Sequence, residues 1–305
     1  MKHLHFCLWV ACCAVIFCNC NPQAQSEGGK KELPHVLVIG IDGCAAHGFS
    51  MTENLPNFKF LMQNGAYTLK ARTIMPSVSG PSWSTILTGT TPERHSVGDN
   101  DWRIENRPME PIIQNEKGLF PTMFWEIRTH YSDAVLGAVY HWSTIGDLIE
   151  KGVCNLSIPA DSEMDATRKA SAFLTEKKPH LTFVHLDHQD HAGHSQGYRS
   201  DDYVKSLERS DSILGIYFDA LKKADLFDKT VLFIVSDHGG INTGHGGPHA
   251  DEMTVPLFVF GPGVKKGYQI EHPTFNYDVA PTIEWLFGIT PNEWVVGKPL
   301  NDLFE

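Results

Sequence analysis

Five uninterrupted apolar runs restrict the fold of this 305-residue chain more than any other feature. A run without polar alternation is typical of a strand buried on both faces of a parallel sheet. The runs cover residues 35–43, 133–140, 181–186, 230–237 and 255–261. Stretches with helix-like patterns lie between them, at 54–65, 121–131, 162–178 and 201–225. This alternation predicts one α/β domain with a mainly parallel central sheet and helices on both faces.

The N-terminal segment has the features of an export signal. A Lys at position 2 is followed by the apolar run FCLWVACCAVIFC and then by a polar stretch. This order predicts a signal peptide at residues 1–20, a linker at 21–34 and a folded domain at 35–305. The run ends in FCNC, which resembles the lipobox of bacterial lipoproteins, with Cys20 as the lipidated residue. We therefore expect a periplasmic or outer-membrane lipoprotein anchored through Cys20, with a soluble secreted protein as the alternative.

Composition and charge limit the classes of partner. Hydrophobic residues make up 42% of the chain, enough for a large core. The net charge of −11 gives no reason to expect a nucleic-acid partner bound by counter-ion release. An anionic substrate would need a local positive charge, which points to metal ions. Beyond the N-terminal segment only Cys44 and Cys154 remain, and the sequence leaves their redox state open.

Three separated segments are rich in Asp and His. They are GIDG with Asp42, DHQDHAGH at 187–194 and SDHGGINTGHGGPH at 236–249. Ligands of open α/β sheets bind outside the carboxyl ends of the strands, and Asp42, Asp190 and Asp237 fall at or just beyond predicted strand ends. Neutral imidazole and carboxylate are ligands for zinc and other borderline divalent ions. A single such residue is usually a turn or surface residue, but three clusters together predict a metal site.

The stretch SGPSWSTILTGTTPERH at 79–95, with DHAGH and SDHGG further along, resembles the alkaline phosphatase superfamily in order and spacing. The resemblance is strongest to the type I phosphodiesterase and nucleotide pyrophosphatase branch, which has Thr/Ser-x-Pro-Asn, then Thr-Gly and Pro-Glu-x-His. It implies an alkaline phosphatase-like catalytic domain that hydrolyses small phosphate esters through a covalent phosphoserine. Phosphodiester or nucleotide pyrophosphate bonds are the first choice of substrate.

The resemblance also implies two zinc ions and the residues that hold them. Those residues are Asp42, Ser79, Asp190, His194, Asp237, His238 and His245. Ser79 is in addition the implied nucleophile, because metal coordination lowers the pKa of an alcohol so that it can attack as an alkoxide. His249 is the alternative to His245, since both follow the SDHGG segment.

Two residues are implied to bind the substrate. The branch has an Asn three residues after the nucleophile, whose amide donates to a phosphoryl oxygen, and this chain has Ser82 there. A hydroxyl can donate from a shorter arm, so we expect a weaker or water-mediated contact. Asn100 matches an Asn that often follows Pro-Glu-x-His in the branch, where it binds substrate or orders a loop.

Three alternatives stay open. A sulfatase of the same superfamily would have Arg where this chain has Trp83, and would use one calcium with oxygen ligands. A phosphomonoesterase would need an extra cation, and Arg72, Arg94 and Arg103 lie near Ser79 in the sequence. A catalytically idle, metal-binding protein is the third alternative, although an idle site has no reason to keep every ligand type and a nucleophile.

Overall fold

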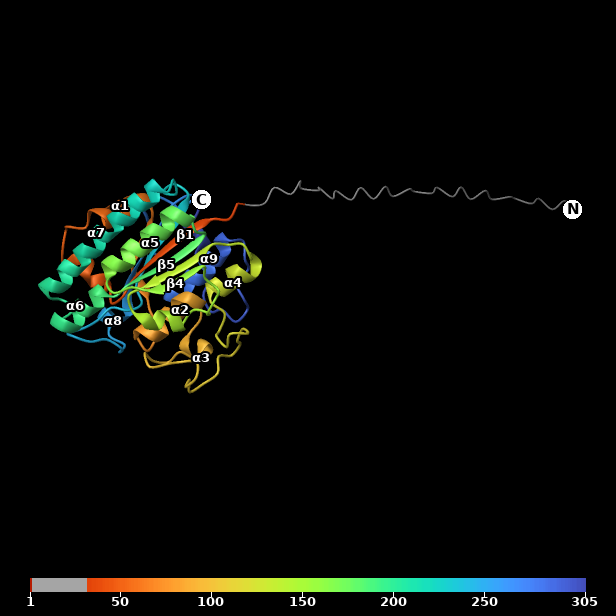
Figure 1. The fold of residues 1–305 in the computed structure, drawn as a ribbon, viewed down its shortest axis with the longest axis horizontal. Helices are drawn as coiled ribbons and strands as arrows, with labels where there is room; N and C mark the ends of the chain where they lie inside the picture. Colours follow the sequence, from red (N-terminus) through yellow and green to blue (C-terminus); the bar gives the residue numbers. More distant parts are fainter. Residues whose placement is uncertain (2–31) are drawn as a thin grey trace. The chain divides into compact units, whose positions relative to one another are not determined.

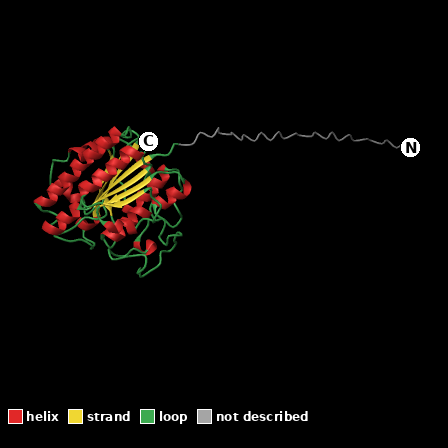
Figure 2. Cartoon of the chain, in the orientation of Figure 1, coloured by secondary structure: helices red, strands yellow, loops and turns green. Residues whose placement is uncertain are grey.

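The computed structural model describes Met1 and residues 32–305. The predicted signal peptide, including Cys20, and most of the predicted linker lie outside the described residues. Leu33–Glu305 form the unit described below, drawn in Figures 1 and 2. None of the helices in this described part has the length and apolar character needed to cross a membrane.

An eight-stranded sheet forms the centre of the described residues, in the order β4-β3-β5-β1-β6-β7-β2-β8. Its strands are β1 His35–Ile41, β2 Ala66–Arg72, β3 Leu136–Tyr140, β4 Leu156–Pro159, β5 Leu181–Leu186, β6 Thr230–Val235, β7 Thr254–Phe260 and β8 Tyr268–Gln269. Strand β7 runs antiparallel to β6 and β2, and the other neighbours are parallel. The predicted mainly parallel sheet is confirmed. Strands β2, β4 and β8 were not predicted, because they are short or interleaved with polar residues.

Helices cover both faces of this sheet (Figures 1 and 2). The helices are α1 Pro56–Asn64, α2 Ser79–Thr88, α3 Pro92–His95, α4 Met123–His130, α5 Glu163–Lys177, α6 His188–Gln196, α7 Asp201–Lys223, α8 Ala250–Met253 and α9 Val279–Leu286. Because successive strand residues point to opposite faces, Leu37 and Ile39 of β1 pack in the cluster with α1, α5 and α7. Val36 and Val38 pack in the cluster with α2, α4 and α9. The described residues therefore form a large core on each side of the sheet.

Helix α2 was not predicted from the sequence, yet it carries the candidate nucleophile at its first residue. Pro81 lies in the first turn, where a helix tolerates a missing backbone N–H. Gly89 ends the helix with a φ of 69°, a conformation that glycine adopts at little cost. All ten residues of α2 are buried, polar ones included. The Ser, Gly and Pro residues at its start obscure the helical pattern in the sequence.

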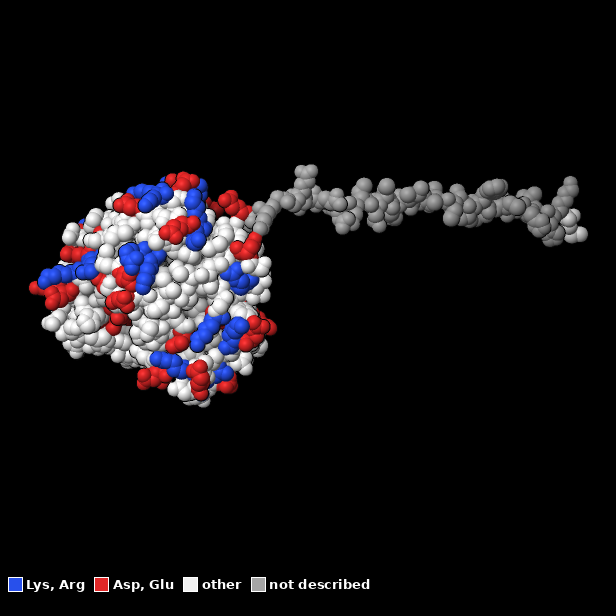
Figure 3. All heavy atoms as spheres, in the orientation of Figure 1, with Lys and Arg blue, Asp and Glu red and all other residues white. Residues whose placement is uncertain are grey.

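Cys44 and Cys154 are both free thiols, so the disulfide that the sequence left open is absent from the described residues. Cys44 is buried, and burial raises the pKa of its thiol to about 12. It acts as a small apolar side chain beside Asp42. On the face drawn in Figure 3, Lys and Arg side chains lie among Asp and Glu side chains, as on an ordinary solvated surface.

Candidate active site

The carboxyl ends of three neighbouring strands bring the Asp and His segments together. Asp42 directly follows β1, Asp237 follows β6, and Asp190 lies in the first turn of α6 just after β5. Strand β1 lies between β5 and β6 in the sheet. Residues separated by more than 140 positions in the chain therefore meet at one edge of the sheet, as expected for an open α/β fold.

The first group, called here the buried centre, consists of Asp42, Asp237 and His238. His238 Nε2 lies 3.5 Å from Asp42 Oδ1 and 3.2 Å from Asp237 Oδ2. The Ser79 hydroxyl at the start of α2 lies 3.2 Å from the same nitrogen. The structure thus places the predicted nucleophile directly beside three of its predicted metal ligands.

The second group, called here the open centre, consists of Asp190, His194 and His245. His194 Nε2 lies 3.3 Å from Asp190 Oδ2 and 3.1 Å from His245 Nε2. The rings of His245 and His238 are stacked, with centroids 3.7 Å apart. The two centres are therefore adjacent, and each potential ligand atom in a centre lies within 4.8 Å of the others.

The three histidines share one hydrogen-bonding arrangement. Each Nδ1 contacts a backbone carbonyl oxygen, which can only accept, so each Nδ1 must carry the proton. The acceptors are Gly239 for His238 at 2.8 Å, Ser77 for His245 at 2.9 Å and Thr243 for His194 at 2.9 Å. In the neutral form each Nε2 then presents a lone pair to its centre, which is how metal-binding histidines are oriented.

The carboxylates of the buried centre each leave one oxygen without a partner among the described residues. Asp237 Oδ1 accepts a hydrogen bond from the Gly43 amide at 3.1 Å, while Asp237 Oδ2 has no donor there. Asp42 is arranged in the same way, with Oδ1 unpartnered. A buried oxygen without a donor is costly. Two such oxygens beside the Nε2 lone pair of His238 fit a divalent cation of the zinc type.

In the protein without metal, charge repulsion also indicates a cation site at the buried centre. Burial, and then repulsion from Asp237 and Asp190, raises the pKa of Asp42 well above its usual range. Burial and the charge of Asp190 likewise raise the pKa of Asp237. A cation between these carboxylates would remove the repulsion that the protein alone leaves uncompensated.

The open centre has the opposite electrostatics. Although burial opposes it, hydrogen bonds from His194 and Tyr198 hold the pKa of Asp190 below its usual range. The hydrogen bond with Asp190 raises the pKa of His194 to about 9. Burial and the neighbouring His238 lower the pKa of His245 to about 4. Without metal, Asp190 and His194 compensate each other as an ion pair.

Asn100 lies at the start of α2, next to the nucleophile. Its Oδ1 accepts a hydrogen bond from the Gly80 amide at 2.7 Å, which fixes the direction of the side-chain amide. A Cβ on Gly80 would lie 2.6 Å from the Asp99 carbonyl oxygen, so only glycine allows this loop to approach. The sequence predicts either substrate binding or loop ordering for Asn100, and its hydrogen bond with the Gly80 amide shows the ordering of the loop.

The structure bears on two other sequence-based assignments. Ser82 is completely buried, and its Oγ accepts a hydrogen bond from Thr73 Oγ1 at 3.1 Å, so its surroundings are those of a core residue. This burial argues against the predicted contact between Ser82 and a phosphoryl oxygen. His249 is not grouped with Asp190 and His194; it caps α8, where its Nδ1 accepts from the Asp251 amide. Of the two candidate histidines, the structure brings His245 into the open centre.

Three residues of the site were not predicted to support it. Trp83 Nε1 and His185 Nε2 both contact Asp42 Oδ2, and the Tyr198 hydroxyl donates to Asp190 Oδ1. All three are fully buried. One sequence signal was available: His185 is a polar residue inside the otherwise apolar strand that leads to the DHQDHAGH segment.

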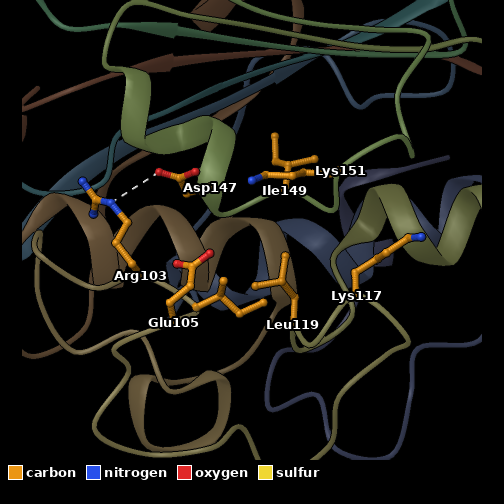
Figure 4. A pocket seen from close by; sticks show the side chains of 8 residues that line it. Arg103, Glu105, Lys117, Leu119, Asp147, Ile149 and Lys151 are labelled. Atoms are coloured by element: carbon orange, nitrogen blue, oxygen red, sulfur yellow. Dashed lines mark ion pairs between the residues drawn. The ribbon is translucent and has the colours of Figure 1, made fainter.

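A cavity of about 230 Å³ lies between the 103–119 loop and the segment at 147–151 (Figure 4). Its lining residues are Arg103, Ile104, Glu105, Lys117, Leu119, Asp147, Ile149 and Lys151. Figure 4 shows Arg103 facing Asp147, and the two charged groups are 3.5 Å apart. Neither centre contributes a residue to the lining, so this cavity is separate from the candidate active site.

A family model for type I phosphodiesterase / nucleotide pyrophosphatase matches residues 36–253. The match covers most of the chain, including Ser79 and both centres. The chain belongs to this family. Its members are metal-dependent hydrolases, in agreement with the donor groups described above, and the predicted resemblance is confirmed.

Curated family members are similar at a modest level. Ectonucleotide pyrophosphatase/phosphodiesterase family member 1 of Rattus norvegicus is 26% identical over 232 residues, which cover 72% of this chain and 25% of that protein. Venom phosphodiesterase 2 of Crotalus adamanteus is 24% identical over 234 residues, which cover 73% of this chain and 28% of that protein. The chain thus spans about a quarter of the length of these relatives.

Solved structures share the fold. An inactive variant of murine ectonucleotide pyrophosphatase/phosphodiesterase 5 in complex with AMP superimposes with a TM-score of 0.73 at 17% identity, covering 90% of this chain and 100% of that chain. A 2-O GAG sulfatase superimposes with a TM-score of 0.72 at 16% identity, covering 89% and 74%. Such identities show the fold alone, and the predicted alkaline phosphatase-like α/β architecture is confirmed.

Proposed function

We propose that this protein is a two-zinc hydrolase that cleaves phosphodiester or nucleotide pyrophosphate bonds through a covalent phosphoserine on Ser79. One observation carries the proposal: among the described residues, the His238 Nε2 atom and two unpartnered carboxylate oxygens converge beside the Ser79 hydroxyl, and the open centre adjoins them through the stacked rings of His238 and His245. Zinc bound there would lower the pKa of that hydroxyl and neutralise charge on the phosphoryl oxygens. The mixed nitrogen and oxygen donors favour zinc over calcium or magnesium.

The chain's own groups define the rest of the reaction. Asp42, Asp237 and His238 would hold one ion beside Ser79, and Asp190, His194 and His245 would hold the other. The Ser79 oxygen attacks phosphorus, and the bond from phosphorus to the leaving oxygen breaks. Water then cleaves the phosphoserine and restores the Ser79 hydroxyl. Both displacements take place at the N-terminus of α2, whose partial positive charge favours an anionic phosphoryl group.

Asn100 is the proposed substrate-binding residue. Because its Oδ1 is held by the Gly80 amide, its Nδ2 keeps a fixed direction at the start of α2. A fixed amide donor next to the nucleophile suits a phosphoryl oxygen that gains charge during the reaction. This role and the ordering of the loop are compatible, since they use different atoms of the same side chain.

The engagement of the nearby arginines favours a diester over a phosphomonoester, whose dianion needs an extra cation. Each of the three candidates already has a protein partner. These partners are Thr254 for Arg72, the Trp294 carbonyl for Arg94, and the Asn100 and Trp102 carbonyls together with Asp147 for Arg103. A sulfatase is disfavoured as well, because Trp83 occupies the position of the required Arg and is a core residue.

Three p-nitrophenyl esters test the proposal: the bis-ester phosphate, the phosphate monoester and the sulfate. We expect the purified protein to hydrolyse the bis-ester at least ~10-fold faster than the others, a difference of about 1.4 kcal/mol in activation free energy. Faster hydrolysis of the sulfate, with calcium in place of zinc in the protein, would refute it. Zinc binding without turnover of any ester would identify the idle, metal-binding alternative.

Ser79→Ala tests the covalent step. Loss of the attacking oxygen should lower kcat by at least ~10³-fold while bound zinc, measured by metal analysis, stays near the wild-type value. Ser84→Ala, which removes another buried hydroxyl of α2, is the matched control and should retain activity. Undiminished turnover by the Ser79 variant would mean that another oxygen attacks.

We also propose that the protein is exported and anchored by a lipid on Cys20, with a soluble secreted form as the alternative. The support is the FCNC sequence at the end of the apolar N-terminal run. Intact-mass analysis of the mature N-terminus tests this, because a diacylglyceryl group on Cys20 has a defined mass. A mature protein that starts elsewhere and is unmodified would favour the soluble form.

A further inference from the structure

The two oxygens of Asp42 have very different surroundings. Oδ2 lies 3.0 Å from the Trp83 indole Nε1, which can only donate, and 2.9 Å from His185 Nε2. Oδ1 has no hydrogen-bond partner among the described residues and faces His238 in the buried centre. The main-chain amide of Asp42 donates to the Leu186 carbonyl at 2.9 Å, which holds the backbone in the sheet. The contacts of Trp83 and His185 with Oδ2 therefore restrict rotation of the Asp42 side chain.

The tautomer of His185 follows from its other ring nitrogen. The Trp142 backbone N–H points at His185 Nδ1 from 3.3 Å, so this nitrogen must accept. The proton of the neutral ring is then on Nε2, which donates it to Asp42 Oδ2. Both contacts to this oxygen are therefore N–H donors, and both donor side chains are fully buried.

Trp83 also links Asp42 to the nucleophile. Ser79 and Trp83 are four residues apart in α2, so they lie on the same face of the helix. The indole packs over β1, where a Cβ on Gly40 would lie 2.5 Å from its Cη2 atom. Glycine at position 40 is thus required for the indole to reach Asp42. One rigid side chain fixes the distance between the helix that carries the nucleophile and the strand that carries the metal ligand.

We propose that Trp83 and His185 form a two-donor clamp that holds Asp42 with Oδ1 alone directed at the buried centre, and that positions α2 relative to it. They are positioning residues, because they contact neither the substrate nor the nucleophile in this role. Without the clamp, Asp42 could rotate, present Oδ2 or bind an ion through both oxygens. The clamp assumes the divalent ion of the proposed function, but it does not depend on which ester is cleaved.

Trp83→Phe tests the clamp, because it removes the N–H while keeping an aromatic ring. In competition with a chromophoric chelator, we expect the metal-free variant to bind zinc about 10- to 100-fold more weakly. This is the usual effect of removing a hydrogen-bond partner of a metal ligand (about 10–100-fold). The control is Trp102→Phe, the same change at a buried indole whose N–H has no partner among the described residues. Equal zinc affinity in the two variants would overturn the proposal.

His185 supplies the second test. His185→Gln keeps an N–H donor and should retain most of the zinc affinity, whereas His185→Leu should lose 10-fold or more (about 10–100-fold is usual). His185 is also near Asp42 and Asp187 in an arrangement that could hold an ion directly. If His185→Leu lowers the number of bound ions while Trp83→Phe leaves affinity unchanged, His185 is a ligand and the clamp is wrong.

Kinetics separate a positioning role from a substrate-binding role. With zinc saturating, the clamp variants should show a lower kcat and an unchanged KM on whichever ester the wild type hydrolyses, because they displace Ser79 and a metal ligand but touch no substrate. A higher KM at unchanged kcat would contradict the clamp. If the wild type binds zinc but cleaves no ester, the proposed function fails, while the zinc titrations still decide whether the clamp exists.

Discussion

The buried and open centres use similar ligands in different surroundings. The side chains of Asp42, Asp237 and His238 are 2%, 0% and 0% exposed, whereas His194 is 46% exposed. In the buried centre, carboxylates repel each other and have unpartnered oxygens; in the open centre, His194 forms an ion pair with Asp190 and Tyr198 donates a hydrogen bond to it. Without metal, the first centre is strained electrostatically and the second is satisfied.

This difference suggests a division of roles. The buried centre is fixed by β1, β6 and α2 and lies against Ser79, so it suits activation of the nucleophile. The open centre reaches solvent through His194, so it suits a phosphoryl or leaving oxygen that arrives with the substrate and departs with the product. A site that must both hold a nucleophile and release a product benefits from one rigid and one accessible ion.

The same substitution in the two centres gives the largest contrast. Both Asp237→Asn and Asp190→Asn should lower kcat by at least ~10³-fold, since each removes a metal ligand worth several kcal/mol of transition-state stabilisation. Their effects on the metal-free protein should have opposite signs. Asp237→Asn should raise the free energy of unfolding at pH 7, and Asp190→Asn should lower it by roughly 1–2 kcal/mol.

The signs follow from the two pKa directions. The raised pKa of Asp237 means that its folded state is penalised as pH rises above the ordinary value, so an uncharged Asn removes the penalty. The lowered pKa of Asp190 means that its charge is favourable at pH 7, so Asn removes a benefit. Urea denaturation after chelation and dialysis measures both. Destabilisation by both substitutions would show that the electrostatic contrast is wrong.

Metal removal should distinguish the centres by rate. With excess chelator, we expect zinc to leave in two phases whose rates differ by at least ~10-fold, because release from the buried centre requires local opening of the structure. The fast phase should correspond to the open centre and should disappear in His194→Asn. A single phase that accounts for all bound zinc in the wild type would remove the distinction between a rigid and an accessible ion.

The positions of the ligands could be predicted from the sequence because they follow strand ends. Asp42, Asp190 and Asp237 come just after apolar runs, and the carboxyl ends of parallel strands meet at one edge. Ser79 was identified by the resemblance of the 79–95 stretch to the family, which gave no indication that a helix begins there.

The supporting residues could not be predicted in the same way. Trp83 and His185 act through Asp42 Oδ2, and that contact depends on the packing of α2 against β1 and β5. Ser82 was assigned to the substrate by its distance from Ser79 along the chain, but in α2 it faces Thr73 in the core. The spacing in the sequence gives the position of Ser82 relative to Ser79. The direction of its side chain depends on helix α2, which the sequence did not predict.

The smallest expected effect concerns the open centre alone. The hydrogen bond with Asp190 raises the pKa of His194 to about 9, from about 6.5 in an unfolded chain. A raised pKa contributes stability that is complete below pH 6.5 and is lost as pH rises to 9. Because His194 is half exposed, the contribution should be less than ~1 kcal/mol.

In metal-free protein, the stability difference between wild type and His194→Asn should therefore shrink from pH 6 to pH 9.5 in urea titrations (roughly the window between the two pKa values). The control is His249→Asn, which keeps a capping side chain on α8 and should follow the wild-type profile. If the stability difference between wild type and His194→Asn instead grows with pH, Asp190 and His194 do not form the ion pair of the open centre.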